Sequence, residues 1–303
     1  MAVRKIRFRI IVLFIVGAII IVGVGLLAGL ITTQNKVEAT MDRDLDVIAN
    51  MADRLISSEM DLLREKDITL AHSIAYTYDT DLMAQVIEEQ LGKLEYKDFI
   101  GITIFNQTGA IASIGRFPIS TELLDDEYIQ RAFEGEAVYS TVRQSPGSDK
   151  LVIHICVPVR KNVVLVATVD GLFFHNFLKD FKIWDTGHVF LMDGEGYMIS
   201  NPREEWIHDR INPIVLAETD HSYDGVASTM KRMIQGESGV SRYTIDGVER
   251  ICVYRPVSSS LVGWSLGAVA PLPESPMNDI QIGFLIVLII CLILCALTAF
   301  IIS

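Results

Sequence analysis

Cysteine is scarce in this chain, which has four in 303 residues. Cys291 and Cys295 lie in an apolar run near the C-terminus, whereas Cys156 and Cys252 lie in two separate strand-like segments. A small fold that depends on disulfides carries several cysteines at short spacings. The sequence therefore shows no disulfide framework, and we predict that Cys156 and Cys252 are buried free thiols.

The patterns that hold metals and cofactors are missing as well. The six histidines never recur at positions i and i+4 on one helix, and no zinc pattern is present. Gly23, Gly25 and Gly29 have part of the spacing of a dinucleotide fingerprint, but they lie in an apolar run rather than after a strand. The last two have the spacing that lets membrane helices pack closely, with ordinary glycine content as the alternative. We expect no metal and no cofactor.

Basic charge is also in short supply. The chain has 26 Lys and Arg against 38 Asp and Glu, a formal charge of −12. Four of the bases lie in residues 1–9, and residues 281–303 carry no charge, which leaves 22 bases against 38 acids between these segments, a charge of −16. Nucleic-acid binding requires a basic surface, so this function is excluded.

Polar residues are almost absent from two long runs. Residues 10–31 are all apolar, and residues 282–302 contain a single polar residue, Thr298. An uninterrupted apolar run of about 18 or more residues predicts a membrane span. The basic residues 1–9 place the N-terminus in the cytoplasm and residues 33–280 outside. A cleaved signal peptide is the alternative, but the first run is longer than the usual ~7–15 residues and is followed by no cleavage site, so we favour an uncleaved anchor.

Residues 33–75 contain neither glycine nor proline and have a helical pattern. Apolar residues recur at spacings of four and three, beginning with Met41, Leu45, Ile48, Ala52 and Leu55. A stripe at this spacing is a packing seam. It predicts a long helix that forms a homodimer along the seam, or alternatively one that packs on its own domain.

Beyond residue 75 the pattern changes to short β-rich runs that are separated by turn residues. Strands are predicted at residues 100–105, 137–142, 151–157, 163–169, 189–192, 240–245, 250–254 and 264–269. Hairpin turns are predicted at 106–109, 193–196 and 246–247, and short helices at 81–93, 126–134 and 226–235. The fold class is therefore α+β with mainly antiparallel sheets.

Two segments of this region repeat each other. Residues 104–111 parallel 191–198, residues 133–136 parallel 234–237, and residues 155–159 parallel 251–257. Each copy has the length of a small domain. The repeat predicts two copies of one module, joined near residues 182–187.

A candidate for catalysis is the segment 263–267, GWSLG, which matches the G-x-S-x-G nucleophile motif in its letters. That motif requires a strand-to-helix turn and a later histidine. Ser265 lies within a predicted strand, and the last histidine, His221, precedes it. A membrane-tethered hydrolase is therefore a remote alternative, and we do not expect an enzyme.

Several motifs of the second copy together resemble one known family. Residues 186–202 resemble its "tGyaflld-dG-iiahP" run, residues 236–247 its "g-sG-y-y--dG" segment, and residues 263–271 its closing "gWslg-v-P" strand. Residues 128–135 and 157–159 of the first copy match more weakly. This is the double Cache (dCache) sensor region of bacterial transmembrane receptors, and the resemblance covers about residues 33–275.

The resemblance implies two stacked PAS-like modules, a membrane-distal one at residues 76–183 and a membrane-proximal one at 186–273, braced by the helix 33–75. Small ligands of the family usually bind the distal module, and one subclass reads amino acids through Y-x-x-x-R-x-W-Y and a later aspartate. The aligned positions here hold Glu122, Asp126, Tyr128 and Ile129, so the arginine that clamps a carboxylate is replaced by an acid. Acids at 122, 125, 126, 127 and 170 favour a cationic or amine ligand.

The predicted ligand-binding residues combine this alignment with strand alternation. The alignment gives Tyr128 and Asp170, alternation places Tyr139 and Arg143 on one face, and His154 lies on one face of the next strand.

The resemblance implies a dimeric ligand-sensing receptor region in the bacterial inner membrane. Ligand binding outside would pass a conformational signal through the second span to a cytoplasmic output beyond Ser303. A chemotaxis signalling domain is the first expectation. The alternatives are the sensor region of a histidine kinase, cyclase or phosphatase, and a stand-alone membrane-anchored binding protein.

Overall fold

The computed structural model describes residues 2–116, 119, 121–145, 148–259 and 263–302. The chain divides into two compact units. One unit is Leu45–Ala270, and the other joins Met1–Asp44 to Pro271–Ser303. The first contains both predicted modules, and the second contains both predicted membrane spans.

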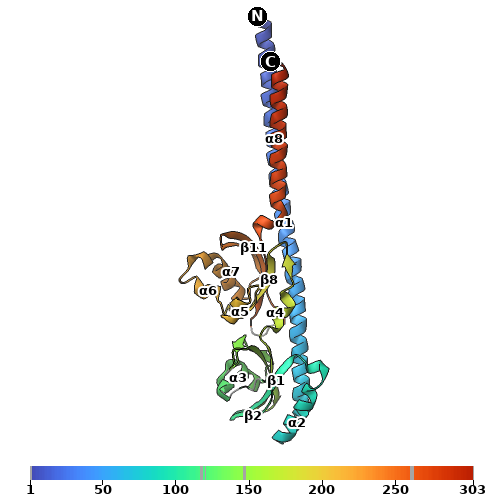
Figure 1. The fold of residues 1–303 in the computed structure, drawn as a ribbon, viewed down its shortest axis with the longest axis vertical. Helices are drawn as coiled ribbons and strands as arrows, with labels where there is room; N and C mark the ends of the chain where they lie inside the picture. The colour runs from blue at the N-terminus through green and yellow to red at the C-terminus, as the bar shows by residue number, and fades with distance from the viewer. Residues whose placement is uncertain (1, 117–118, 120, 146–147, 260–262, 303) are drawn as a thin grey trace. The chain divides into compact units, whose positions relative to one another are not determined.

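The terminal unit is built from the first part of helix α1 (Ala2–Ile74) and from α8 (Pro276–Ile302), which run side by side (Figure 1). A Cβ added at Gly29 would lie 3.4 Å from the ring of Phe284, an ordinary van der Waals distance, so the two helices contact each other here without requiring glycine. Within the described residues, the segment Ile20–Ile74 is long and apolar enough to cross a membrane, and the apolar stretch Ile282–Leu294 is shorter. The first helix therefore fits a membrane span, and the second span stays a prediction.

The helix predicted at 33–75 is confirmed as part of α1, which ends at Ile74. Most of its buried residues in the larger unit recur at spacings of three and four: Leu45, Ala49, Ala52, Ile56, Met60, Leu63, Asp67, Leu70 and Ile74. This stripe is rotated from the predicted seam, because Ala49 and Ile56 are buried whereas Ile48 and Leu55 are only half-buried. The buried stripe packs on the chain's own modules, which was the alternative to the dimer seam.

The first module contains a six-stranded antiparallel sheet in the order β2-β1-β6-β5-β3, with β4 also paired to β5. The strands are β1 (Phe99–Asn106), β2 (Gly109–Gly115), β3 (Val138–Tyr139), β4 (Arg143–Gln144), β5 (Leu151–Arg160) and β6 (Val163–Asp170). The helices are α2 (Thr80–Leu91), α3 (Glu127–Phe133) and α4 (Phe173–Leu178), with short 3₁₀ turns at Leu94–Tyr96 and Thr121–Asp125.

The second module contains a sheet in the order β10-β11-β12-β8-β7, with β9 also paired to β8. The strands are β7 (Lys182–Ile183), β8 (Gly187–Met192), β9 (Met198–Ser200), β10 (Gly239–Ile245), β11 (Val248–Pro256) and β12 (Ser265–Pro271). The helices, which lie to the left of this sheet in Figure 1, are α5 (Glu205–His208), α6 (Pro213–Leu216) and α7 (Asp224–Ile234), with 3₁₀ turns at His221–Tyr223 and Leu272–Glu274.

The two sheets confirm the internal repeat. The order β2-β1-β6-β5-β3 of the first corresponds strand for strand to β9-β8-β12-β11-β10 of the second. The turn at Asp246–Gly247 is the predicted two-residue hairpin, with Ile245 paired to Val248 and positive φ at both turn residues. Cys156 and Cys252 are buried free thiols, as predicted.

One predicted strand, at residues 137–142, is interrupted. Only Val138–Tyr139 and Arg143–Gln144 pair with β5. Between them, the Ser140 hydroxyl accepts a hydrogen bond from the His154 backbone N–H at 2.9 Å, a position that a strand carbonyl would otherwise fill. The side chain thereby replaces the backbone ladder and ends the regular alternation of faces.

Candidate functional site

The sheet of the first module has one face toward α1 and one face away from it. The Tyr139 hydroxyl donates a hydrogen bond to the Met60 carbonyl of α1, which identifies the helix-facing side. Tyr139 pairs with Ile155, whereas Arg143 pairs with Val152 and His154 pairs with Thr168. Since neighbouring residues of a strand point to opposite faces, Arg143 and His154 belong to the face that is turned away from α1.

Four side chains on that face form a group that we call the first-module cluster: Asp126, Tyr128, Arg143 and His154. The Arg143 guanidinium donates hydrogen bonds to the Asp126 carboxylate and to the Tyr128 hydroxyl. It also lies 5.1 Å from the centre of the Tyr128 ring. The Tyr128 ring also stacks on His154, with centroids 5.9 Å apart and an interplanar angle of 21°.

His154 is the buried member of the cluster, with 2% of its surface exposed. Its Nδ1 lies 3.2 Å from the Thr168 hydroxyl, while its Nε2 is buried and has no hydrogen-bond partner among the described residues. Burial, together with the nearby Arg143 charge, lowers the pKa of His154 to about 3. The imidazole is therefore neutral at physiological pH and leaves one polar atom unsatisfied in the interior of the module.

Two of the five predicted ligand-binding residues lie elsewhere. Tyr139 packs against Phe174 and Trp264, with ring centroids 6.4 and 6.1 Å away. Asp170 is exposed at the end of β6 and accepts a hydrogen bond from the Leu172 backbone N–H at 2.8 Å. The common face predicted for Tyr139 and Arg143 is wrong, because the strand is interrupted between them.

The acidic residues that led us to predict a cationic or amine ligand also differ in their surroundings. Asp126 is paired with Arg143, and the side chain of Glu122 lies outside the described residues. Arg143 thus supplies, from β4, a guanidinium that the aligned motif position lacks. Thr168 was not predicted, although its register opposite His154 is the signal that could have found it. Beyond the cluster, this face of the sheet is filled by an apolar core of Phe105, Ile129, Ala132, Val138, Cys156, Val164 and Val166.

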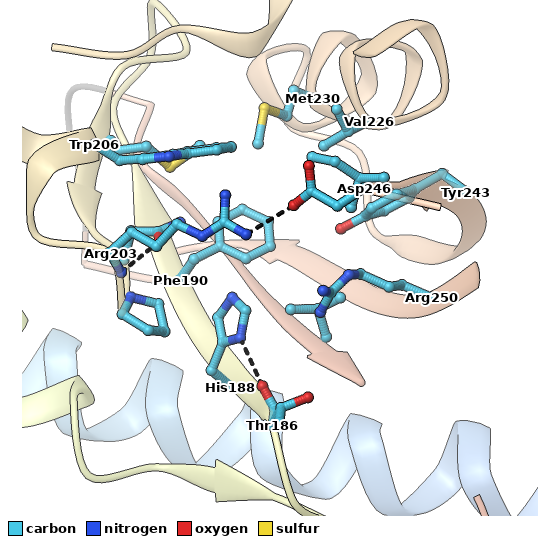
Figure 2. Close-up of a pocket in the computed structure, with 15 residues that line it drawn as sticks. Thr186, His188, Phe190, Arg203, Trp206, Val226, Met230, Tyr243, Asp246 and Arg250 are labelled. Atoms are coloured by element: carbon cyan, nitrogen blue, oxygen red, sulfur yellow. Dashed lines mark hydrogen bonds and ion pairs between the residues drawn. The ribbon is translucent and has the colours of Figure 1, made fainter. Parts of the chain in front are cut away.

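The second module has a cavity of about 240 Å³ on the corresponding part of its fold (Figure 2). Its apolar walls come from Phe190 of β8, Met198 of β9, Trp206 of α5 and Met230 of α7. The ring of Phe190 lies against Gly267 of β12, where an added Cβ would meet the ring at 2.4 Å. Only glycine at this position leaves room for the ring.

The same cavity is lined by charged and polar groups. The Arg203 guanidinium donates to the Asp246 carboxylate at 2.7 Å, as the dashed line in Figure 2 marks, and it lies 5.6 Å from the centre of the Trp206 ring. Arg250 has a buried Nε with no hydrogen-bond partner among the described residues. Burial lowers the pKa of His188 to about 4, so that this histidine is neutral near pH 7.

Sequence reasoning did not identify this cavity. The signal was present, because several of its lining residues belong to the motifs of the second copy: Thr186, His188, Phe190, Asn201, Pro202, Tyr243 and Asp246. The candidate nucleophile Ser265 is not part of it. Its side chain is fully buried and donates to the Met233 carbonyl at 2.9 Å.

Comparison with solved structures shows the same fold in other sensor domains. The ligand-binding domain of the Pseudomonas fluorescens chemoreceptor CtaA, in complex with L-isoleucine, matches with a TM-score of 0.65 and 15% identity over 80% of this chain and 98% of that one. The PctB domain of Pseudomonas aeruginosa PAO1, in complex with L-Arg, matches with a TM-score of 0.61 and 14% identity over 78% and 97%. The extracellular domain of mmHK1S-Z2, described as a histidine kinase, matches with a TM-score of 0.63 and 16% identity over 78% and 98%. Comparison with curated proteins gives no match.

Two copies of one antiparallel module that pack on a single long helix define an extracytoplasmic sensor region of the kind found in membrane receptors. The family model of the Cache domain, in its double form dCache_1, matches residues 31–276. The chain therefore belongs to the double Cache family, as its motifs indicated.

Proposed function

We propose that this chain senses a small molecule outside the membrane and that the first-module cluster is where the molecule binds. The observation that carries this proposal is the unsatisfied, buried Nε2 of His154 beside the Arg143–Asp126 pair. Buried polar atoms are normally hydrogen-bonded, so an orphan next to a charged pair is a place where a ligand atom gains a partner. Tyr128 supplies an aromatic surface on the same face.

The ligand that suits this cluster is a small zwitterion of the amino-acid class. Arg143 has five N–H donors and uses two neighbours here, so it can also hold a carboxylate. Asp126 can accept an ammonium group while it stays next to Arg143. The amino-acid complexes of the CtaA and PctB domains support this class. The cationic or amine ligand that the acidic residues favour is the second candidate, since Asp126 alone would suffice for it.

The proposed topology has two membrane spans, at residues 10–31 and 282–302, in a bacterial inner membrane. The N-terminus lies in the cytoplasm and residues 33–280 lie outside, with a membrane-distal module at 76–183 and a membrane-proximal one at 186–273. The described apolar side chains of both spans support contact with lipid, because residues such as Ile21, Leu27, Ile282 and Leu294 are half or more exposed. Ligand binding shifts an equilibrium between two arrangements of the helices, by as much as the ligand's affinity for the two differs.

The proposed output is a chemotaxis signalling domain on the cytoplasmic side, reached through the second span. A histidine kinase, cyclase or phosphatase is the alternative, and the likeness to both chemoreceptor and histidine-kinase domains supports keeping both. A stand-alone binding protein is the remaining alternative. We also propose a homodimer, supported by apolar residues on the outer face of α1, where Val47, Met51 and Leu62 are 48–60% exposed.

The test is a thermal-shift screen of the full chain in lipid nanodiscs. Each L-amino acid is compared with its amine, which lacks the carboxylate, and with its des-amino acid. Arg143→Gln is expected to abolish any shift caused by an amino acid, while Arg131→Gln, which removes a partly exposed arginine on α3 that pairs with Glu136, leaves it unchanged. A shift by amines alone supports the second candidate. A ligand whose shift survives both Arg143→Gln and His154→Phe binds elsewhere, and the proposal is then wrong.

A further inference from the structure

The second-module cavity is independent of the first-module cluster, and it carries an inference beyond the proposed function. We propose that it is a second ligand site, which binds a small monocarboxylate with an apolar body, about ten non-hydrogen atoms in all.

The size of the ligand follows from the volume. A cavity of about 150 Å³ with an apolar lining holds a benzene molecule. The second-module cavity has about 240 Å³, which leaves room for a ring or a branched chain together with a short arm that ends in a polar group. In the first module, the part of the corresponding face beyond the first-module cluster is packed with apolar side chains, so the repeated fold does not by itself require a cavity here.

The side chains that line the second-module cavity determine that the main part of the ligand is apolar. Phe190, Met198, Trp206 and Met230 present aromatic and thioether surfaces, which adapt to flat or branched apolar groups. The Phe190 ring has room against β12 because Gly267 has no Cβ. Trp206 and Met230 come from helices on the other side of the cavity, as Figure 2 shows. A ring that enters the cavity is therefore covered on more than one side.

The charged residues that line the cavity determine which polar group the ligand carries. Two guanidinium groups, Arg203 and Arg250, face the cavity together with one carboxylate, Asp246. Asp246 is already paired with Arg203, and His188 is neutral, which leaves one positive charge in excess. A cation would find no unpaired acid among the lining residues. A monoanion would neutralise the excess and give the buried Nε of Arg250 the partner it lacks.

The position of Arg250 fits this role. It pairs with Tyr243 across β10 and β11, so both side chains point to the same face of the sheet. Tyr243 is 8% exposed and also lines the cavity. A carboxylate held by Arg250 would therefore lie deep against the sheet, with the apolar body toward Trp206 and the helices.

The experiment uses the full chain in nanodiscs and three probes of one shape: 3-phenylpropionate, the neutral 3-phenylpropanamide and the cationic 3-phenylpropylamine. Binding is measured by isothermal titration and by the fluorescence change of Trp206, with Trp206→Phe to assign the signal. We expect the carboxylate to bind at least tenfold more tightly than the amide and the amine. Similar affinities for the three probes, or no binding of the carboxylate at millimolar concentration, would overturn the proposal.

Variants then locate the site. Arg250→Gln is expected to weaken binding of 3-phenylpropionate at least tenfold. Arg242→Gln, on an exposed residue of the neighbouring strand that does not line the cavity, should leave it unchanged. Arg143→Gln in the first module should also leave it unchanged, and this result separates the second site from the proposed function. If Arg143→Gln abolishes binding and Arg250→Gln does not, the carboxylate binds the first-module cluster and the second site is refuted. Because the probe series is measured on the unaltered chain, the proposal stays testable even if a variant fails to fold.

Discussion

The carboxylate of Asp53 on α1 accepts two hydrogen bonds from Ser258, at 2.8 Å from its backbone N–H and at 2.6 Å from its hydroxyl. Ser258 follows β11 in the second module, 205 residues further along the chain. Asp53 is 7% exposed and also accepts a hydrogen bond from Ser57 at 3.1 Å. The long helix is therefore fixed to the second module by a buried carboxylate whose donors come largely from one loop.

Replacement of Asp53 by alanine should lower the melting temperature of the chain. Hydrogen bonds to a charged acceptor contribute about 1.5–3 kcal/mol each, and their loss would leave the Ser258 N–H without a partner. We expect a decrease of several degrees by differential scanning fluorimetry. Glu65→Ala, at an exposed position of the same helix, is the matched control and should change little. Equal melting temperatures for the two variants would show that the contact adds nothing to stability.

Asp67 should make the protein less stable as the pH rises. It lies fully buried in the packing stripe of α1, and neither carboxylate oxygen has a hydrogen-bond partner among the described residues. Burial raises the pKa of Asp67 well above its usual value, so the folded state holds a proton that the unfolded state releases. Stability is fully present below the unfolded pKa and is lost as the pH rises toward the folded pKa, by about 1.4 kcal/mol per pH unit.

Asp67→Asn replaces the titrating carboxyl group by an amide of nearly the same shape, so that this position no longer binds or releases a proton on unfolding. The variant should melt at a higher temperature than the unaltered chain at pH 8, and the difference should shrink at pH 5. A difference that is constant across this range would contradict the assignment, because it would mean that Asp67 does not change its charge on folding.

His154 should have the opposite effect at acid pH. The pKa of His154 in the folded state is about 3, below its unfolded value. Between these two pKa values the unfolded state binds a proton that the folded state does not bind. Its contribution to stability is present above about pH 6.5 and is lost as the pH falls toward 3, again by about 1.4 kcal/mol per pH unit.

Replacement of His154 by phenylalanine should reduce the loss of stability between pH 7 and pH 4, measured by chemical denaturation. The ring keeps its stacking on Tyr128 and loses only the titrating nitrogens. His208→Phe, at an exposed position of α5, is the control and should leave the acid dependence as it is. An unchanged acid dependence in the His154 variant would show that the ring is accessible to protons in the folded state.

The proposed dimer predicts a specific cross-link. Met51 is 60% exposed at the centre of the outer apolar face of α1. With Cys291 and Cys295 replaced by alanine, Met51→Cys should form a disulfide-linked dimer under mild oxidation in nanodiscs. Glu249→Cys, at an exposed position of β11, should not. Cross-linking of both variants to the same extent would indicate random collision rather than a helix interface.

The fold was largely predictable because its signals are local or repeated. The strands around Ile104, Ile155 and Leu191 alternate or run as apolar segments, and the Asn106–Gly109 and Asp246–Gly247 turns carry the residues that hairpins need. Short elements such as α5 and α6 were missed, since four residues show no period.

The first-module cluster was only partly predictable. Tyr128, Arg143 and His154 were named from alignment and alternation, and the structure brings them together. Tyr139 was assigned to the same face as Arg143, but the Ser140 hydroxyl replaces a ladder bond and turns the chain between them. The pairing of Asp126 with Arg143 joins residues from a helix and a strand, a relationship that no spacing along the chain expresses.

The sequence by itself determined the apolar runs, the long helix, the repeated module and the family, because each depends on periodicity and composition that neighbouring residues share. The tertiary structure alone decided which face of α1 is buried, which polar atoms of His154 and Arg250 have no partner among the described residues, and which residues line the cavity of the second module. The physical reason is that burial and hydrogen-bond satisfaction depend on neighbours in space. Those neighbours come from strands and helices far apart in the chain.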